Sequence, residues 1–177
     1  MYDRTKGLIQ PTGIERPWFE DGIIVTKTDL KGHITSVNEV FLEMAQLTEE
    51  QALGQPHNIV RHPDMPRCIF QLIWDTLATK NEIFAYINNL ATSGDHYWVF
   101  ANITPIFNDQ QEVVGYHSKR LQPRPDQIAK IIPLYERLLA EEKKYSSPKD
   151  GIAASTKLLH EILKEKDLTY HQFIFSL

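Results

Sequence analysis

The stretch NIVRHPDMP, residues 58–66, gathers three ionisable side chains within four positions of a proline-broken segment. Arg61 carries a permanent positive charge, His62 titrates near neutral pH and Asp64 supplies a carboxylate. Such a group can bind an anion, hold a metal ion, take part in catalysis or begin a helix.

The simplest prediction from residue chemistry is the start of a helix. Asp64 can cap a helix whose first turn contains Pro66, where a missing N–H costs nothing. The alternative is a ligand site, because an arginine binds phosphate through two parallel hydrogen bonds and His62 can donate to phosphate or ring acceptors. The two readings are compatible. A metal site is disfavoured, since His57 and His62 are five positions apart with no cysteine or carboxylate at the usual spacing.

Composition excludes several classes of protein. The chain has 177 residues, 42% of them hydrophobic and 24% charged, which is enough for one domain of ordinary size with a core. The net charge is −4 and no basic cluster is present, so we expect no nucleic-acid partner. The single cysteine, Cys68, excludes a disulfide within the chain, and no window approaches about 20 apolar residues. We therefore expect a soluble cytoplasmic protein that does not insert into a membrane.

The first half of the chain predicts an N-terminal arm, a β-hairpin and helices. Residues 1–20 are polar and broken by proline and glycine. The β-branched runs 23–28 and 33–37 flank the turn sequence DLKG and predict the hairpin. Asn38 is a suitable N-cap for the helix that follows, and Thr48 begins another short helix that ends at Gly54. Beyond Pro66 an apolar stripe predicts an amphipathic helix of about four turns, with Cys68 as a small buried residue.

The second half predicts three strands and then helices. Residues 82–91, 96–107 and 112–122 are rich in β-branched and aromatic residues and are separated by turn sequences. Adjacent Asn88 and Asn89 must point to opposite faces of their strand, so one of them faces the cleft. Residues 123–177 predict helices, the first kinked or restarted at Pro133, with a break at 146–151.

This order, β-β-α-α-α-β-β-β followed by helices, predicts an α+β fold. We expect a five-stranded antiparallel sheet with helices on one face and a cleft between helix and sheet. The apolar stripes of the C-terminal helices need a partner. They can pack back on the domain or form a dimer or partner interface.

The strings GQPHNIVRHPDMP (54–66), LIWDTL (72–77), GDHYWVFANITPI (94–106) and VVGYHSKR (113–120) resemble the PAS domain of bacterial aerotaxis receptors. The resemblance covers roughly residues 20–122 and implies a PAS fold. It divides the chain into an N-terminal arm (1–20), a PAS sensor domain (21–122) and a C-terminal helical extension (123–177). The chain departs from the family pattern on the cleft-facing strand, where Ile83 and Ala85 replace a tryptophan and a glycine.

The resemblance implies a non-covalent FAD cofactor that senses redox state or oxygen. The positions carried over by motif are His57, Asn58, Arg61, His62, Asp64, Trp74 and Asn89. Aromatic residues that could stack on the flavin ring are Trp74, Trp98, Tyr97 and Tyr116, although each is more often a core residue. The sequence around Cys68 does not resemble the adduct-forming motif of light-sensing flavin PAS domains.

Three functions remain open. The first is a flavin sensor that signals to a protein partner, such as the chemotaxis machinery, as a homodimer. The second is a PAS interaction module without a cofactor, and a haem gas sensor using His57, His62, His96 or His117 is a variant of the first. The third, an enzyme, is disfavoured, because the sequence carries no recognisable nucleophile–base arrangement and no dinucleotide or P-loop glycine motif.

Overall fold

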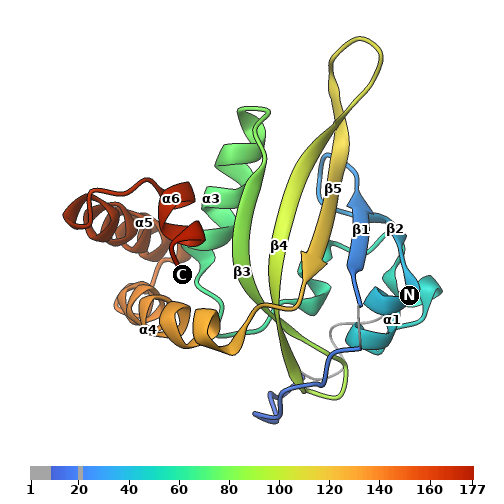
Figure 1. Cartoon of the computed structure of the whole chain (residues 1–177), viewed down its shortest axis with the longest axis horizontal. Helices are drawn as coiled ribbons and strands as arrows, with labels where there is room; N and C mark the ends of the chain where they lie inside the picture. The colour runs from blue at the N-terminus through green and yellow to red at the C-terminus, as the bar shows by residue number, and fades with distance from the viewer. Residues whose placement is uncertain (1–8, 20–21) are drawn as a thin grey trace.

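The structure is a computed structural model that describes residues 9–19 and 22–177 (Figure 1). The predicted order of elements is confirmed, with a short 3₁₀-helix, η1, before the long helix α3. The strands are β1 (Ile24–Thr28), β2 (Ile34–Val37), β3 (Ile83–Leu90), β4 (His96–Phe107) and β5 (Val113–Leu121). The helices are α1 (Glu39–Ala45), α2 (Glu49–Ala52), η1 (His57–Val60), α3 (Arg67–Ala78), α4 (Pro125–Glu142), α5 (Pro148–Glu165) and α6 (Tyr170–Phe175).

The turn and helix-capping residues of the first half have the roles predicted from the sequence. The turn between β1 and β2 closes at Gly32, whose φ of +81° suits a residue without a side chain. The side chain of Asn38 accepts a hydrogen bond from the Phe41 amide at the start of α1. Thr48 and Gln51 form a reciprocal capping box on α2. These caps fix where each short helix begins.

The start of α3 differs from the prediction. Its N-cap is Pro66, which has no side-chain hydrogen bond, so the expectation that Asp64 caps this helix was wrong. The cap comes from far along the chain, because the Cys68 amide donates to Glu142 Oε1 at 3.0 Å. Ser155 donates to the same oxygen at 3.0 Å. Glu142 therefore joins α3, α4 and α5 at one point.

The five strands form one antiparallel sheet in the order β2-β1-β5-β4-β3. The last strand, β5, lies at the centre between β1 and β4. Along β5 the side chains of Tyr116, Ser118 and Arg120 share one face because strand residues alternate. That face meets α3, and the core lies between the two.

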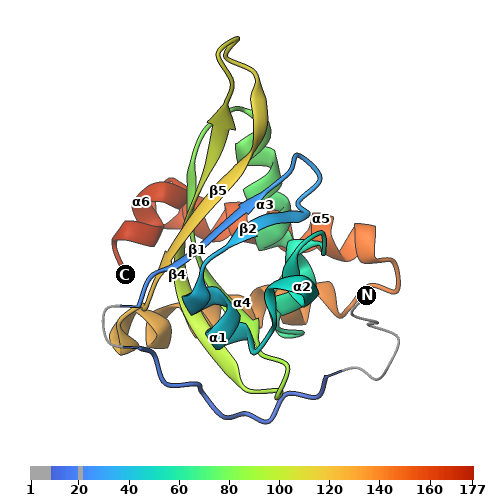
Figure 2. The same ribbon diagram turned by 90° about the vertical axis from the view of Figure 1, so that its right-hand side faces the viewer.

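Figure 2 shows α2 and α6 on opposite sides of the sheet. The aromatic contacts agree, because the Phe175 ring of α6 lies 4.8 Å from Phe84 and 5.8 Å from Phe100, on the face turned away from α3. The C-terminal helices thus pack back on the domain, one of the two arrangements that the sequence left open. Residues that they bury include Ile131, Leu134, Tyr135, Leu138, Leu159, Ile162, Leu163, Phe173 and Ile174.

Two details of the C-terminal helices refine the sequence prediction. Helix α4 runs through Pro133 from Pro125 to Glu142 without a restart. The predicted break at 146–151 is shorter, because Pro148 to Gly151 already form the first turn of α5. Ser147 supplies the cap by accepting from the Asp150 amide, and Pro148 fits the first helical position.

The outer edge of β3 is occupied by two different segments. Tyr135 of α4 donates to the carbonyl of Tyr86 at 2.7 Å. The Asn88 carbonyl accepts from the His62 amide at 3.3 Å, and the Asn88 amide contacts the sulfur of Met65 at 3.2 Å. The NIVRHPDMP segment and α4 therefore share the edge strand.

The described part of the N-terminal arm lies beside the turn that joins β3 and β4. Thr12 donates through its amide to the Gly94 carbonyl, and Ile14 and Arg16 exchange backbone hydrogen bonds with His96. A side chain at Gly94 would collide with the Gln10 carbonyl, 2.3 Å from an added Cβ. As expected, this part of the arm adds only an isolated bridge to the sheet and begins no regular element.

The contact between α4 and β3 gives a stability prediction. In Tyr135→Phe the buried Tyr86 carbonyl loses its partner, and we expect the free energy of unfolding to fall by about 1–3 kcal/mol. The measurement is urea unfolding followed by circular dichroism. Tyr145→Phe is the matched control, because Tyr145 is exposed and should change stability by less than about 0.5 kcal/mol. Equal stability of the two variants would mean that the hydrogen bond contributes nothing.

Candidate functional site

A cavity of about 320 Å³ lies between α3 and the sheet. This volume is at the lower end of the usual range for small-molecule sites. Its wall is formed by α3, η1, the β1–β2 turn and strands β1, β3, β4 and β5. The lining residues are Thr26, Thr28, Lys31, Gly32, Pro56, His57, Asn58, Arg61, Phe70, Ile73, Trp74, Leu77, Ile87, Asn89, Ile103, Tyr116, Ser118 and Arg120.

Five of the seven positions carried over by motif line this cavity. His57 and Asn58 come from η1, Arg61 follows η1, Trp74 comes from α3 and Asn89 from β3. The expectation that one of the two adjacent asparagines faces the cleft is met by Asn89. Their role in binding a ligand stays a prediction.

His62 and Asp64 do not line the cavity. The His62 ring is 6% exposed, and its Nδ1 accepts a hydrogen bond from the Asp64 amide at 3.1 Å. Burial lowers the pKa of His62, a shift that the nearby Asp64 carboxylate partly opposes. The Asp64 side chain is 69% exposed. These two residues shape the loop that carries Arg61 instead of facing the cavity themselves.

Two opposed apolar walls make the cavity suitable for a flat ring system. Ile73 and Leu77 line it from the helix side, and Ile87 and Ile103 line it from the sheet side. Ala85, on the same face of β3, is fully buried but is not part of the lining. The residues that depart from the family pattern on β3 therefore leave a cavity in place.

One end of the cavity is framed by aromatic rings. Trp74 and Tyr116 meet edge to face with centroids 5.5 Å apart. The Trp74 side chain is 40% exposed, which puts it at the rim. A Cβ at Gly32 would lie 3.1 Å from the Trp74 ring, so the hairpin turn packs closely on the indole.

Arg61 is held at the wall by contacts from its own loop and from α3. Its Nη2 donates to the Met65 carbonyl at 2.8 Å, and its guanidinium carbon lies 4.6 Å above the Phe70 ring. Stacking on an aromatic face leaves the edges of a guanidinium able to donate. Arg61 thus presents a positioned positive charge to the cavity.

A second arginine, Arg120, is buried in the sheet wall. Its Nη2 lies 2.7 Å from His57 Nε2 and 3.1 Å from Thr26 Oγ1. A guanidinium can only donate, so His57 Nε2 accepts and the imidazole proton is on Nδ1. Burial, reinforced by the charge of Arg120, holds the pKa of His57 well below 6.5. His57 is therefore neutral at physiological pH.

Polar atoms near Arg120 lack protein partners. Arg120 is 4% exposed and forms no ion pair with the residues described, and its Nη1 is buried without a hydrogen bond. The hydroxyl of Ser118, on the same face of β5, is also buried and unpartnered. Burial lowers the pKa of Arg120 to about 10, so it keeps its charge at neutral pH.

Thr26, Ser118 and Arg120 line the cavity but were not predicted from the sequence to do so. Thr26 and Ser118 are small polar residues of a type common on exposed strand faces. The available signal was the alternation in GYHSKR, which puts Tyr116, Ser118 and Arg120 on one face of a central strand. Only the strand order makes that face the cavity wall.

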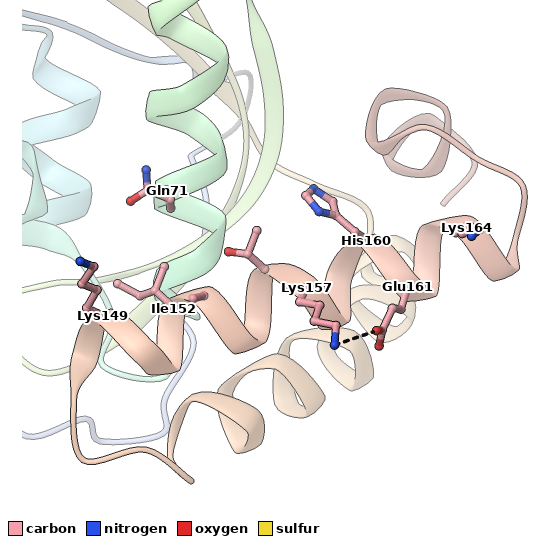
Figure 3. Close-up of a pocket in the computed structure, with 9 residues that line it drawn as sticks. Gln71, Lys149, Ile152, Lys157, His160, Glu161 and Lys164 are labelled. Carbon is pink, nitrogen blue, oxygen red and sulfur yellow. Dashed lines mark ion pairs between the residues drawn. The ribbon is translucent and has the colours of Figure 1, made fainter.

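A wider hollow lies over α5 beside Gln71 of α3 (Figure 3). Its lining includes the Lys157–Glu161 ion pair at 3.8 Å, whose side chains are 79% and 56% exposed. Exposed pairs of this kind are solvated and bind weakly. The cavity under α3 is therefore the better candidate for a specific site.

A helix-flanked, five-stranded antiparallel sheet with a cavity under its long helix is the architecture of a small sensor domain. Residues 34–118 match the sequence profile of the PAS fold. The chain is a PAS-domain protein related to the aerotaxis receptors. It is 38% identical over 124 residues to the aerotaxis receptor of Escherichia coli, an alignment that covers 70% of this chain and 24% of the receptor.

Other similar proteins agree on the domain. The nitrogen fixation regulatory protein of Klebsiella pneumoniae is 30% identical over 94 residues, which is 53% of this chain and 19% of that protein. A PAS domain from Colwellia psychrerythraea superposes with a TM-score of 0.53 at 23% identity, over 57% of this chain and 86% of that one. A light-oxygen-voltage domain studied with a flavin analogue gives a TM-score of 0.56 at 14% identity, over 65% and 86%. The chain spans about a quarter or less of the curated relatives.

Residues 9–19 and 22–177 contain neither a membrane-spanning helix nor a metal-binding cluster. No helix there has the length and apolarity needed to cross a bilayer. No cluster of three or more histidine, cysteine or acidic side chains is arranged to hold a metal ion in this part of the chain.

The neutral, buried His57 gives a prediction on pH. Below pH 6.5 the unfolded chain gains a proton at His57 that the folded chain does not, so acid lowers the free energy of unfolding. Between pH 7.5 and 5.5 this contribution amounts to about 1.4 kcal/mol. In His57→Gln the acid-induced loss should be smaller by that amount, as measured by urea unfolding at both pH values. His160→Gln, at an exposed site on α5, is the control and should match the wild type.

Proposed function

We propose that the chain is a redox or oxygen sensor whose cavity binds FAD and which signals to a protein partner. The observation that carries this proposal is a cavity with two opposed apolar walls, a buried polar wall on β5 and a positioned arginine, Arg61. When bound, a flavin supplies reversible electron transfer. The chain supplies the shape, the hydrogen bonds and the charges around it.

The residues present fit such a group. The walls formed by Ile73, Leu77, Ile87 and Ile103 suit the faces of a flat ring system. Ser118 has an unpartnered buried hydroxyl that can serve a ring edge with carbonyl and nitrogen acceptors. The cavity of about 320 Å³ suits the ring alone, so the rest of FAD would extend past it.

In this proposal Arg61 binds a phosphate of the part that extends from the cavity. Its guanidinium stacks on Phe70 at the cavity wall, and an arginine can bind phosphate through two parallel hydrogen bonds. His62 and Asp64 act through the loop that positions Arg61, since neither lines the cavity. Asn58, Trp74 and Asn89 contribute to the lining around the ligand.

The relatives support a sensing role. The aerotaxis receptor of E. coli shares 38% identity over most of this chain, and the sequence strings on which the resemblance rests include residues that line the cavity. A structural neighbour has been studied with a flavin analogue. We infer a cytoplasmic signalling module that acts as a homodimer on a protein partner of the chemotaxis type and performs no catalysis of its own.

A haem sensor is the second candidate, and the geometry favours it less. Of the four histidines proposed as haem ligands, His57 alone lines the cavity. Its Nε2 is already engaged by Arg120 at 2.7 Å. Iron coordination at that nitrogen would require the buried guanidinium to move away.

The visible spectrum of the purified protein tests the proposed function. A chain that binds FAD should show the two absorption bands of oxidised flavin, and these should bleach on addition of dithionite and return in air. A Soret band would instead identify haem. A colourless protein that fails to take up added FAD would contradict the sensor proposal and leave the PAS interaction module.

The role of Arg61 gives a mutational prediction. In Arg61→Ala we expect the affinity for FAD to fall by about 10- to 100-fold, the equivalent of one or two charge-assisted hydrogen bonds. Riboflavin, which lacks phosphate, should bind the variant and the wild type alike. Arg67→Ala is the control, because Arg67 is exposed on the neighbouring helix and lies outside the lining. Equal FAD affinity in all three proteins would remove Arg61 from the site.

A further inference from the structure

The guanidinium of Arg120 is a buried positive charge that no acidic side chain balances within residues 9–19 and 22–177. Its partners are a neutral imidazole and a hydroxyl, at 2.7 Å from His57 and 3.1 Å from Thr26. Tyr97 is also close enough to interact, but burial raises its pKa and keeps the phenol neutral. Taking an unpaired charge out of water costs several kcal/mol. A purely structural role could be filled by a neutral side chain.

The unsatisfied atoms point into the same region. Arg120 Nη1 and Ser118 Oγ are buried and make no hydrogen bond with the described residues, and both side chains line the cavity. They lie two positions apart on β5, on the face turned to α3. Two buried donors without acceptors indicate that a group from outside the chain is meant to accept from them.

We propose that Arg120 and Ser118 form a subsite for an anionic, electron-rich edge of the ligand, so that the cavity binds the reduced form of its flavin more tightly than the oxidised form. This deepens the proposed function and rests on it for the identity of the ligand. A flavin that takes two electrons from a reductant and one proton from water carries one negative charge on its pyrimidine edge. The charge of Arg120 then gains a counter-charge that the described residues do not supply.

His57 completes the subsite as a positioning residue. Because its Nε2 accepts from Arg120, it holds the guanidinium in place without neutralising it. A carboxylate at the same position would cancel the charge and repel an anionic ligand. The Phe41 ring, 5.9 Å from the imidazole, and the buried setting of both keep His57 in this neutral state.

The test compares the two oxidation states of bound flavin. For wild type and Arg120→Met, the midpoint potential of bound FAD is measured at pH 7.5 by dithionite titration with a reference dye. We expect the preference for reduced over oxidised flavin to fall at least tenfold in the variant, which lowers the two-electron potential by about 30 mV. Arg120→Lys should retain most of the preference. Arg124→Met, at an exposed site just beyond β5, should match the wild type.

Two outcomes would overturn the proposal. One is a flavin-loaded Arg120→Met protein whose potential equals that of the wild type. If this variant does not fold, Arg120→Gln replaces it, because glutamine is neutral but can still form a hydrogen bond with Thr26 or His57. The other outcome concerns the wild-type chain alone, freed of cofactor. At constant ionic strength, urate, a planar anion, should raise its melting temperature more than caffeine, a planar neutral compound, and equal effects would contradict an anion subsite.

The measurement with urate also allows the failure of the anion subsite to be distinguished from the failure of the proposed FAD sensor function. A wild-type chain that takes up no flavin contradicts the FAD sensor, and stabilisation by urate would then still support the anion subsite. A chain that binds FAD with a potential insensitive to Arg120 keeps the sensor function and loses the subsite.

Discussion

The cavity is built around the buried Arg120, which has no carboxylate partner among residues 9–19 and 22–177. Its guanidinium meets His57 from η1 and Thr26 from β1, so three segments far apart in the chain converge on one charge. The arrangement depends on β5 being the central strand, with β1 on one side and β4 on the other. The β1–β2 hairpin, η1 and β5 must all be in place before the guanidinium of Arg120 has its hydrogen-bond partners.

The NIVRHPDMP segment contributes residues both to the cavity wall and to the edge of β3. Arg61 reaches the cavity, whereas His62 and Met65 contact the backbone of Asn88 at the edge of β3. The rigid path through Pro63 and the hydrogen bond from the Asp64 amide to the His62 ring hold the loop in one conformation. Residues that line the cavity and residues that contact β3 therefore lie within one short stretch.

Much of the fold could be predicted because its signals are local. β-branched runs, the DLKG turn and the caps at Asn38 and Thr48 each determine a nearby element, and the family strings supply the order. The cap of α3 could not be predicted, because Glu142 lies 74 residues from Cys68. The same holds for Arg120, since nothing in its neighbours reveals that β5 becomes the centre of the sheet. The cavity residues on α3 and β3 could be predicted from sequence motifs and from the alternation of strand side chains. The polar residues on β5 could be identified only once the strand order was known.

The edge strand β3 is covered by residues of α4 and α6. An uncovered edge strand exposes backbone donors and acceptors that pair readily with another chain. Here Tyr135 binds the Tyr86 carbonyl, and Phe175 covers Phe84 and Phe100 on the adjoining face. A fragment that ends after β5 would lack Tyr135 and Phe175. It would expose the edge of β3 and its aromatic side chains to other protein molecules. The C-terminal helices thus protect the domain against aggregation. The shortest fragment that does not aggregate extends through α6.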